Sequence, residues 1–174
     1  MTNHRSPPFA HQPSTTAARL RLTNCQVVDF LHQEIGKSGT GEIAVLIMEL
    51  RRAYRLDAMI GGISTQSIMR YTDRCLNNLL RDADRYAHFS GEQICLVLPG
   101  LANKDQGVLA AIRILSELQK PFKIGNHPVT LRPHIGIANF PEFGHDAGQL
   151  LMCADIASRI ASTNERGYHA YRPE

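Results

Sequence analysis

The chain has 174 residues, 43% of them hydrophobic, a formal net charge of +3 at pH 7, and four scattered cysteines without a CxxC pair. A chain of this length suits one domain with a short extension and needs no disulfide or metal for stability, and its small charge gives no reason to expect a nucleic-acid partner. No apolar run approaches the roughly 18 residues of a membrane-spanning helix, so we expect a cytoplasmic domain with reduced thiols. This expectation is compatible with a parent protein that is membrane-associated.

The first 19 residues are rich in Pro, Ser and Thr and carry few large apolar side chains. Such a segment buries too little surface to offset its ordering entropy, so we expect 1–19 to be a disordered arm. Residues 20–35 partly follow helical spacing, with Asn24 as the expected N-cap. Residues 42–50 (EIAVLIMEL) form an almost continuous apolar run, which predicts a strand buried on both faces.

The middle of the chain predicts a helix followed by a β-hairpin. Apolar residues recur at helical spacing over 63–80. Two runs that favour strands, Tyr86–Phe89 and Ile94–Leu98, then flank the polar turn Ser90-Gly91-Glu92-Gln93. A glycine in this turn permits the positive φ that a tight hairpin needs. The hairpin therefore carries a carboxylate, Glu92, at its tip.

The last third of the chain predicts alternating helices and strands. A helix is expected over 108–118, before Pro121, then a strand over 129–138, a helix over 150–160 and a short edge strand over 168–171. The hairpin excludes a purely parallel sheet. We therefore predict an α/β (α+β) domain in which helices flank a mixed central sheet of about five strands.

Three segments resemble the diguanylate cyclase (GGDEF) family in order and spacing. SGEQI, followed by CLVLPG, is similar to the GG(D/E)EF signature and its Leu-Pro-Gly strand. HIGIANFP at 134–141 resembles the family's Ser-Ile-Gly-Ile-Ala-x-x-Pro, and LLMCADIA at 150–157 resembles Leu-Leu-x-x-Ala-Asp-x-Ala. The resemblance implies that 20–174 form a single palm-like domain related to nucleotidyl cyclases. Such domains condense two GTP molecules into cyclic di-GMP.

The resemblance also places the family's metal ligands on this chain, with substitutions. Carboxylates hold divalent metal against the triphosphate, where charge develops in the transition state. The family's Asp-x-Asp corresponds to Glu49 and Arg51, which puts a cation where an anion is expected. Glu92 keeps the ligand position of the turn, while Gln93 replaces the next acidic residue. Glu49 and Glu92 are therefore the candidate ligands, and Mg²⁺ is the expected cofactor of any GTP binding that remains.

The family's nucleotide contacts are altered as well. Asp57 and Gln66 stand at the two guanine-reading positions, and Ser162 replaces a phosphate-contacting lysine, although Arg166 remains. Two unit charges about 4 Å apart interact by roughly 4 kcal/mol at an effective dielectric near 20, and each 1.4 kcal/mol is about tenfold in rate. A cation at Arg51 together with these losses predicts a degenerate catalytic site that does not turn GTP over efficiently.

A second candidate site precedes the hairpin. Arg81-Asp82-Ala83-Asp84 matches the family's inhibitory product site, an Arg-x-x-Asp five residues before the signature turn. Arginine presents a planar fork to phosphate and to guanine edges, and aspartate accepts from guanine N–H groups. Arg113 corresponds to a third arginine that some members contribute. The alternative for Arg81 and Asp84 is an ordinary i,i+3 ion pair, and Arg113 is equally suited to an exposed helix face.

Three functions remain open at this point. The first is a degenerate GGDEF domain that acts in cyclic di-GMP signalling as a regulatory or receptor module. The second is a cyclase with weak residual activity through Glu49 and Glu92. The third is a nucleotide-free scaffold, including a homodimerisation domain. The resemblance further implies a neighbouring phosphodiesterase (EAL) domain in the parent protein.

Overall fold

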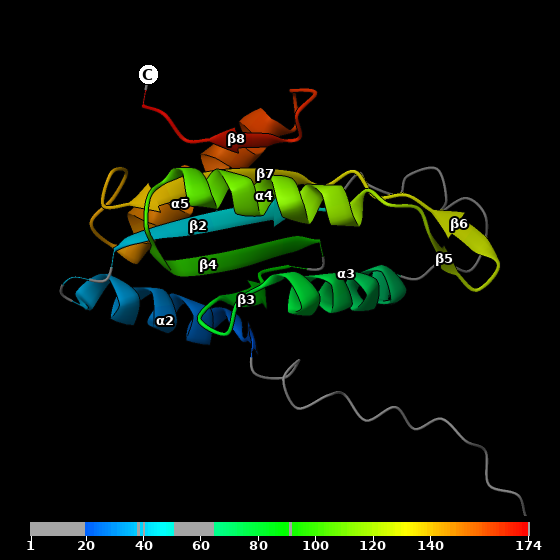
Figure 1. The fold of residues 1–174 in the computed structure, drawn as a ribbon, viewed down its shortest axis with the longest axis horizontal. Helices are drawn as coiled ribbons and strands as arrows, with labels where there is room; N and C mark the ends of the chain where they lie inside the picture. Colours follow the sequence, from blue (N-terminus) through cyan, green and yellow to red (C-terminus); the bar gives the residue numbers. More distant parts are fainter. Residues whose placement is uncertain (1–19, 38, 40, 51–64, 91, 174) are drawn as a thin grey trace, which may run out of the picture.

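The structure, a computed structural model, describes residues 20–37, 39, 41–50, 65–90 and 92–173. The expected disordered arm over 1–19, as well as Arg51 and Asp57, lies outside these residues. The described helices are interspersed with single strands and with runs of two or three strands along the chain (Figure 1). They are β1 (Arg21–Leu22), α2 (Asn24–Gly36), β2 (Glu42–Glu49), α3 (Thr65–Leu79), β3 (Arg85–His88), β4 (Gln93–Leu101), α4 (Asp105–Leu118), β5 (Phe122–Ile124), β6 (His127–Val129), β7 (His134–Phe140), α5 (Ala147–Ala161) and β8 (Tyr168–Ala170).

The main sheet is mixed, as predicted, with the strand order β1-β3-β4-β2-β7-β8. β2 pairs antiparallel with both β4 and β7, whereas the outermost strands β1 and β8 pair parallel with β3 and β7. The sheet has one strand more than expected, because the two-residue β1 adds to its border. β5 and β6 form a separate antiparallel hairpin.

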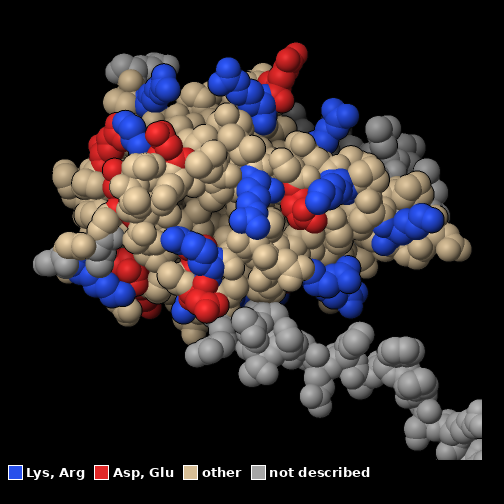
Figure 2. All heavy atoms as spheres, in the orientation of Figure 1, with Lys and Arg blue, Asp and Glu red and all other residues tan. Residues whose placement is uncertain are grey.

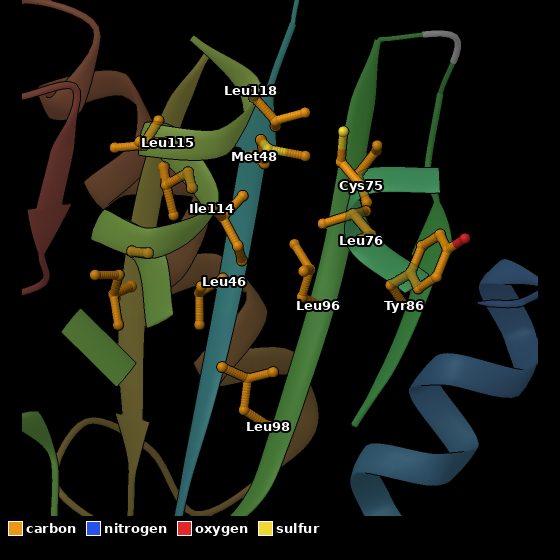
Figure 3. Close-up of a cluster of buried hydrophobic side chains, with 14 of the residues drawn as sticks. Leu46, Met48, Cys75, Leu76, Tyr86, Leu96, Leu98, Ile114, Leu115 and Leu118 are labelled. Atoms are coloured by element: carbon orange, nitrogen blue, oxygen red, sulfur yellow. The ribbon is translucent and has the colours of Figure 1, made fainter. Parts of the chain in front are cut away.

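β2 lies in the middle of the sheet and is covered on both faces. Its residues Ala44, Leu46 and Met48 belong to a cluster with side chains of α3 and α4, which Figure 3 shows on one side of the sheet. The alternate residues Ile43, Val45 and Ile47 pack with side chains of α2 and α5 on the other side. Successive strand residues point to opposite faces, so the six residues of β2 between Glu42 and Glu49 are all apolar and buried. The expected α/β architecture is thereby confirmed.

Two local expectations were wrong. The strand predicted over 129–138 is two elements, since β6 ends at Val129 and β7 begins at His134. Pro133 lies directly before β7 and has no backbone N–H for a strand ladder. The N-cap of α2 is Thr23 rather than Asn24, because Thr23 and Gln26 form a capping box. Asn24 instead donates from its side chain to the carbonyl oxygen of Phe89.

Among the described residues, no helix combines the length and the hydrophobicity needed to cross a lipid bilayer. The basic side chains on the face seen in Figure 2 stand singly or beside acidic ones and do not join into a continuous stripe.

Candidate functional site

The β3–β4 hairpin carries the first candidate site and is tied to the end of β2. The backbone N–H of Leu50 donates to the carbonyl oxygen of Glu92 at 2.8 Å, and Phe89 N–H donates to the carbonyl oxygen of Gln93 at 2.8 Å. In the sheet, Glu49 of β2 is paired with Gln93 on one side and with His134 on the other. Strand register thus brings the predicted positions Glu49 and Gln93 together.

The side-chain amide of Gln93 bridges two carboxylates. Its Nε2 donates to Glu49 Oε1 at 2.6 Å and to Asp155 Oδ1 of α5 at 3.3 Å. The other oxygen of Asp155 accepts from Arg159 at 2.7 Å. A neutral amide and a guanidinium therefore hold both carboxylates, and we call Glu49, Gln93, Asp155 and Arg159 the corner cluster.

A cavity of about 480 Å³ opens beside the corner cluster. Among the described residues, Ser158, His134 and Ser162 also line it, and Glu92 does not. Ser158 is 1% exposed, and its hydroxyl has no hydrogen-bond partner among the described residues. Sequence reasoning missed Asp155, Ser158 and Arg159. The only available signal was an acidic residue within the apolar segment LLMCADIA.

The corner cluster does not fit a divalent cation. Mg²⁺ takes oxygen ligands in near-ideal octahedral geometry, and the group placed between Glu49 and Asp155 is an N–H donor. Within the part of the chain that the structure describes, no three acidic, histidine or cysteine side chains gather as a metal site. Glu49 and Glu92 therefore remain a predicted ligand pair.

Of the predicted nucleotide contacts that the structure describes, Gln66 and Arg166 lie away from the corner cluster. Gln66 is exposed in the first turn of α3, and Arg166 is exposed in the turn before β8. Neither of them lines the cavity beside the corner cluster. Ser162 does line it, as the C-cap of α5, and its hydroxyl donates to the carbonyl oxygen of Arg159 at 2.6 Å.

The second candidate site lies at the turn between α3 and β3. Asp84 is 3% exposed and accepts from the backbone N–H of Arg81 at 2.7 Å and from its guanidinium at 2.8 Å. Arg81 also donates to the carbonyl oxygen of Pro99 in β4 at 2.9 Å. The ion pair expected from the i,i+3 spacing is thus present, and it is anchored to the neighbouring strand.

The three predicted residues of this second site share one cavity. It has a volume of about 320 Å³, and its wall includes Arg81, Asp84 and Arg113. Arg113 is exposed on α4 and reaches the pocket from that helix. The rest of the described wall is mainly apolar and comes from the end of α3 and the residue after it, from β4 and from α4. It includes Leu79, Leu80, Leu98, Leu101, Leu109, Ala110, Ile114 and the polar Gln106. We call this cavity the Arg81 pocket.

A third cavity, of about 820 Å³, lies between the start of α2, α3 and β3. At its wall Asp73 accepts from Arg21 at 3.0 Å and lies 2.7 Å from His88 Nε2. Figure 3 shows the Tyr86 hydroxyl pointing from the core toward α2, on the side of this cavity. Burial, together with the nearby Asp73 carboxylate, raises the pKa of Tyr86, so that its hydroxyl stays neutral.

Comparison with known proteins identifies the fold and relatives of the chain. Residues 23–167 match the family model described as "Diguanylate cyclase, GGDEF domain". The crystal structure of the GGDEF domain of TpbB from Pseudomonas aeruginosa superposes with a TM-score of 0.81 at 22% identity, over 88% of this chain and 98% of that one. The GGDEF domain of DgcB from Caulobacter crescentus, solved in complex with c-di-GMP, gives 0.75 at 14% identity, over 98% of both chains.

Curated relatives are considerably longer than this chain. Diguanylate cyclase TpbB of P. aeruginosa is 26% identical over 72% of this chain and 29% of its own length. Cyclic di-GMP phosphodiesterase PdeR of Escherichia coli is 27% identical over 84% of this chain and 22% of its own. Cyclic di-GMP phosphodiesterase NbdA of P. aeruginosa is 23% identical over 66% and 15%. The chain therefore spans less than a third of each of these relatives.

Proposed function

The chain belongs to the GGDEF family of cyclic di-GMP signalling domains, and we propose that it is a catalytically degenerate member that serves as a regulatory or receptor module. In this proposal the Arg81 pocket binds cyclic di-GMP, while the corner cluster does not turn GTP over. A phosphodiesterase domain in a longer parent protein is the proposed recipient of the signal, because two of the relatives are cyclic di-GMP phosphodiesterases.

The observation that carries the proposal is the meeting of Arg81, Asp84 and Arg113 on one cavity wall. Two guanidinium groups suit phosphate oxygens and the O6 and N7 acceptors of guanine, and a carboxylate suits guanine N–H donors. Leucines cover the remaining wall and offer apolar area to a flat base. Arg81 is held in place by Asp84 and Pro99, so little ordering of this side chain opposes binding.

The corner cluster supports the loss of catalysis in the same proposal. Phosphoryl transfer by this family depends on carboxylates that are available to a divalent metal. Here the amide of Gln93 and the guanidinium of Arg159 already engage Glu49 and Asp155. Restoring metal binding would require these contacts to break before any triphosphate is positioned.

Isothermal titration of the purified chain tests the proposal against both alternatives. We expect saturable binding of cyclic di-GMP, and no heat and no product with GTP plus Mg²⁺. Sustained formation of cyclic di-GMP from GTP would establish the residual cyclase instead. If the folded protein binds neither cyclic di-GMP nor GTP, the receptor proposal is wrong, and the result supports the nucleotide-free scaffold.

A further inference from the structure

We propose that Gln93 sets the ligand specificity of the corner cluster, because its amide takes the position of a divalent cation between Glu49 and Asp155. The inference deepens the proposed loss of catalysis and is independent of cyclic di-GMP binding. In this inference the side chain of Gln93 is the main obstacle to Mg²⁺ or Mn²⁺ at the corner, and Arg159 adds to it.

The orientation of the amide follows from its partners. Both oxygens that approach the Gln93 side chain belong to carboxylates, which accept hydrogen bonds and do not donate them when ionised. The group that faces them must therefore be the NH₂ group and not the carbonyl oxygen. Its two hydrogens serve the two carboxylates, one from β2 and one from α5.

Two carboxylates that face one point are also what a divalent cation requires. Mg²⁺ and Mn²⁺ are bound by carboxylate and carbonyl oxygens that point at a common centre. Glu49 and Asp155 point at a common centre, and the amide nitrogen occupies it. A cation that entered would have to displace this nitrogen and would recover only a neutral carbonyl oxygen from the same side chain.

Arg159 also opposes the binding of a divalent cation at the corner cluster. Its guanidinium donates to the Asp155 oxygen that Gln93 does not use, at 2.7 Å. The charge of Asp155 is thereby offset from within α5, at an i,i+4 spacing. The two carboxylates of the corner are thus both engaged, Glu49 by the amide and Asp155 by the amide and the guanidinium.

One substitution should reverse the specificity. Gln93→Glu removes both N–H donors and places a third carboxylate among the oxygens of Glu49 and Asp155. Their mutual repulsion is relieved when a divalent ion binds between them. We expect the affinity for Mn²⁺ to rise by about tenfold or more.

Electron paramagnetic resonance of free Mn²⁺, recorded with protein alone and no nucleotide, measures this affinity. Gln149→Glu is the matched control, because it adds the same charge to the far end of α5 and keeps the acceptor that His145 N–H uses. The exchange Gln93→Glu with Glu49→Gln is the second control, because it keeps the amide–carboxylate hydrogen bond between positions 49 and 93 and the number of carboxylates at the corner. Both controls should bind Mn²⁺ as weakly as the wild-type protein does.

Thermal denaturation with and without Mn²⁺ gives an independent readout, since only a protein that binds the ion is stabilised by it. If Gln93→Glu is unfolded without the ion, recovery of its circular dichroism on adding Mn²⁺ supports the inference, and failure to recover overturns it. Wild-type protein that binds Mn²⁺ as tightly as Gln93→Glu would also overturn it. Cyclic di-GMP titration is a separate measurement, so either proposal can fail alone.

Discussion

Gly136 of β7 lies so close to Ser158 of α5 that a Cβ atom on Gly136 would stand 2.0 Å from the Ser158 backbone nitrogen. The same Cβ would stand 2.1 Å from the carbonyl oxygen of Ala154. The backbone of α5 therefore fills the space in which a side chain at position 136 would lie. The glycine therefore lets α5 rest directly on the sheet and brings Asp155 within reach of Gln93.

Gly136→Ala should lower the free energy of unfolding by about 3 kcal/mol, because a backbone contact cannot be relieved by a side-chain rotation. Urea denaturation measures the loss. Gly36→Ala at the end of α2 is the control, since a Cβ there meets nothing within 4 Å, and it should leave stability unchanged or raise it slightly. Equal effects of the two substitutions would show that α5 shifts away from the sheet at no cost.

Asp84→Ala should lower the free energy of unfolding by about 2 kcal/mol. The buried carboxylate accepts from both the backbone and the guanidinium of Arg81, and charge-assisted hydrogen bonds are among the stronger ones. Asp82→Ala, in the same turn but exposed, should change stability by less than about 0.5 kcal/mol. Chemical denaturation of the two variants compares them directly, and indistinguishable midpoints would contradict a structural role for Asp84.

Arg113→Ala should weaken cyclic di-GMP binding by about tenfold or more, because one of two cationic forks is lost from the Arg81 pocket. Its thermal stability should stay unchanged, since the side chain is exposed. Arg132→Ala removes the same charge from an exposed residue at a different cavity and is the control in the titration. If both variants lose affinity equally, the attraction is a general effect of charge and not a contact in the pocket.

Stability should decline in alkali. Burial, with a smaller effect of the Cys75 thiol, raises the pKa of Tyr71 from 10.0 to about 12. The folded protein thus keeps a proton that the unfolded chain releases, so this contribution is complete below pH 10 and is lost as the pH rises toward 12. Burial raises the pKa of Cys95 as well, and its contribution has the same sign.

Tyr71→Phe tests the assignment of this alkaline decline. The substitution preserves the ring that stacks on Phe122 with centroids 3.5 Å apart and removes the titrating hydroxyl. Guanidinium denaturation between pH 9 and pH 12 should then show a shallower fall in the free energy of unfolding than in the wild-type protein. If the free energy of unfolding falls equally steeply with pH in both proteins, groups other than Tyr71 cause the loss of stability in alkali.

The elements that were predicted correctly carry a strong local signal. The apolar run of β2 and the two flanks of the hairpin identify strands by composition, and α5 follows helical spacing over four turns. β1, β5 and β6 have only two or three residues, too few for any periodicity to show. β1 pairs with β3, far along the chain, whereas β5 and β6 pair with each other in a local hairpin that is too short to be recognised from its composition.

The candidate sites divide in the same way. The pairing of Arg81 with Asp84 is set by a spacing of three residues, so it could be predicted. The contact between Gln93 and Asp155 joins residues 62 apart and depends on how α5 lies on the sheet. The leucine wall of the Arg81 pocket likewise needs α3, β4 and α4 to be placed in space before it exists.

The borders of the main sheet also have a consequence for solution behaviour. β1 and β8 are two and three residues long, whereas β2 and β4 have eight and nine. Short borders expose few unpaired backbone groups to an incoming strand, which is one way in which proteins avoid fibril-like growth. Two copies of this domain would therefore have little to gain by joining their sheets edge to edge.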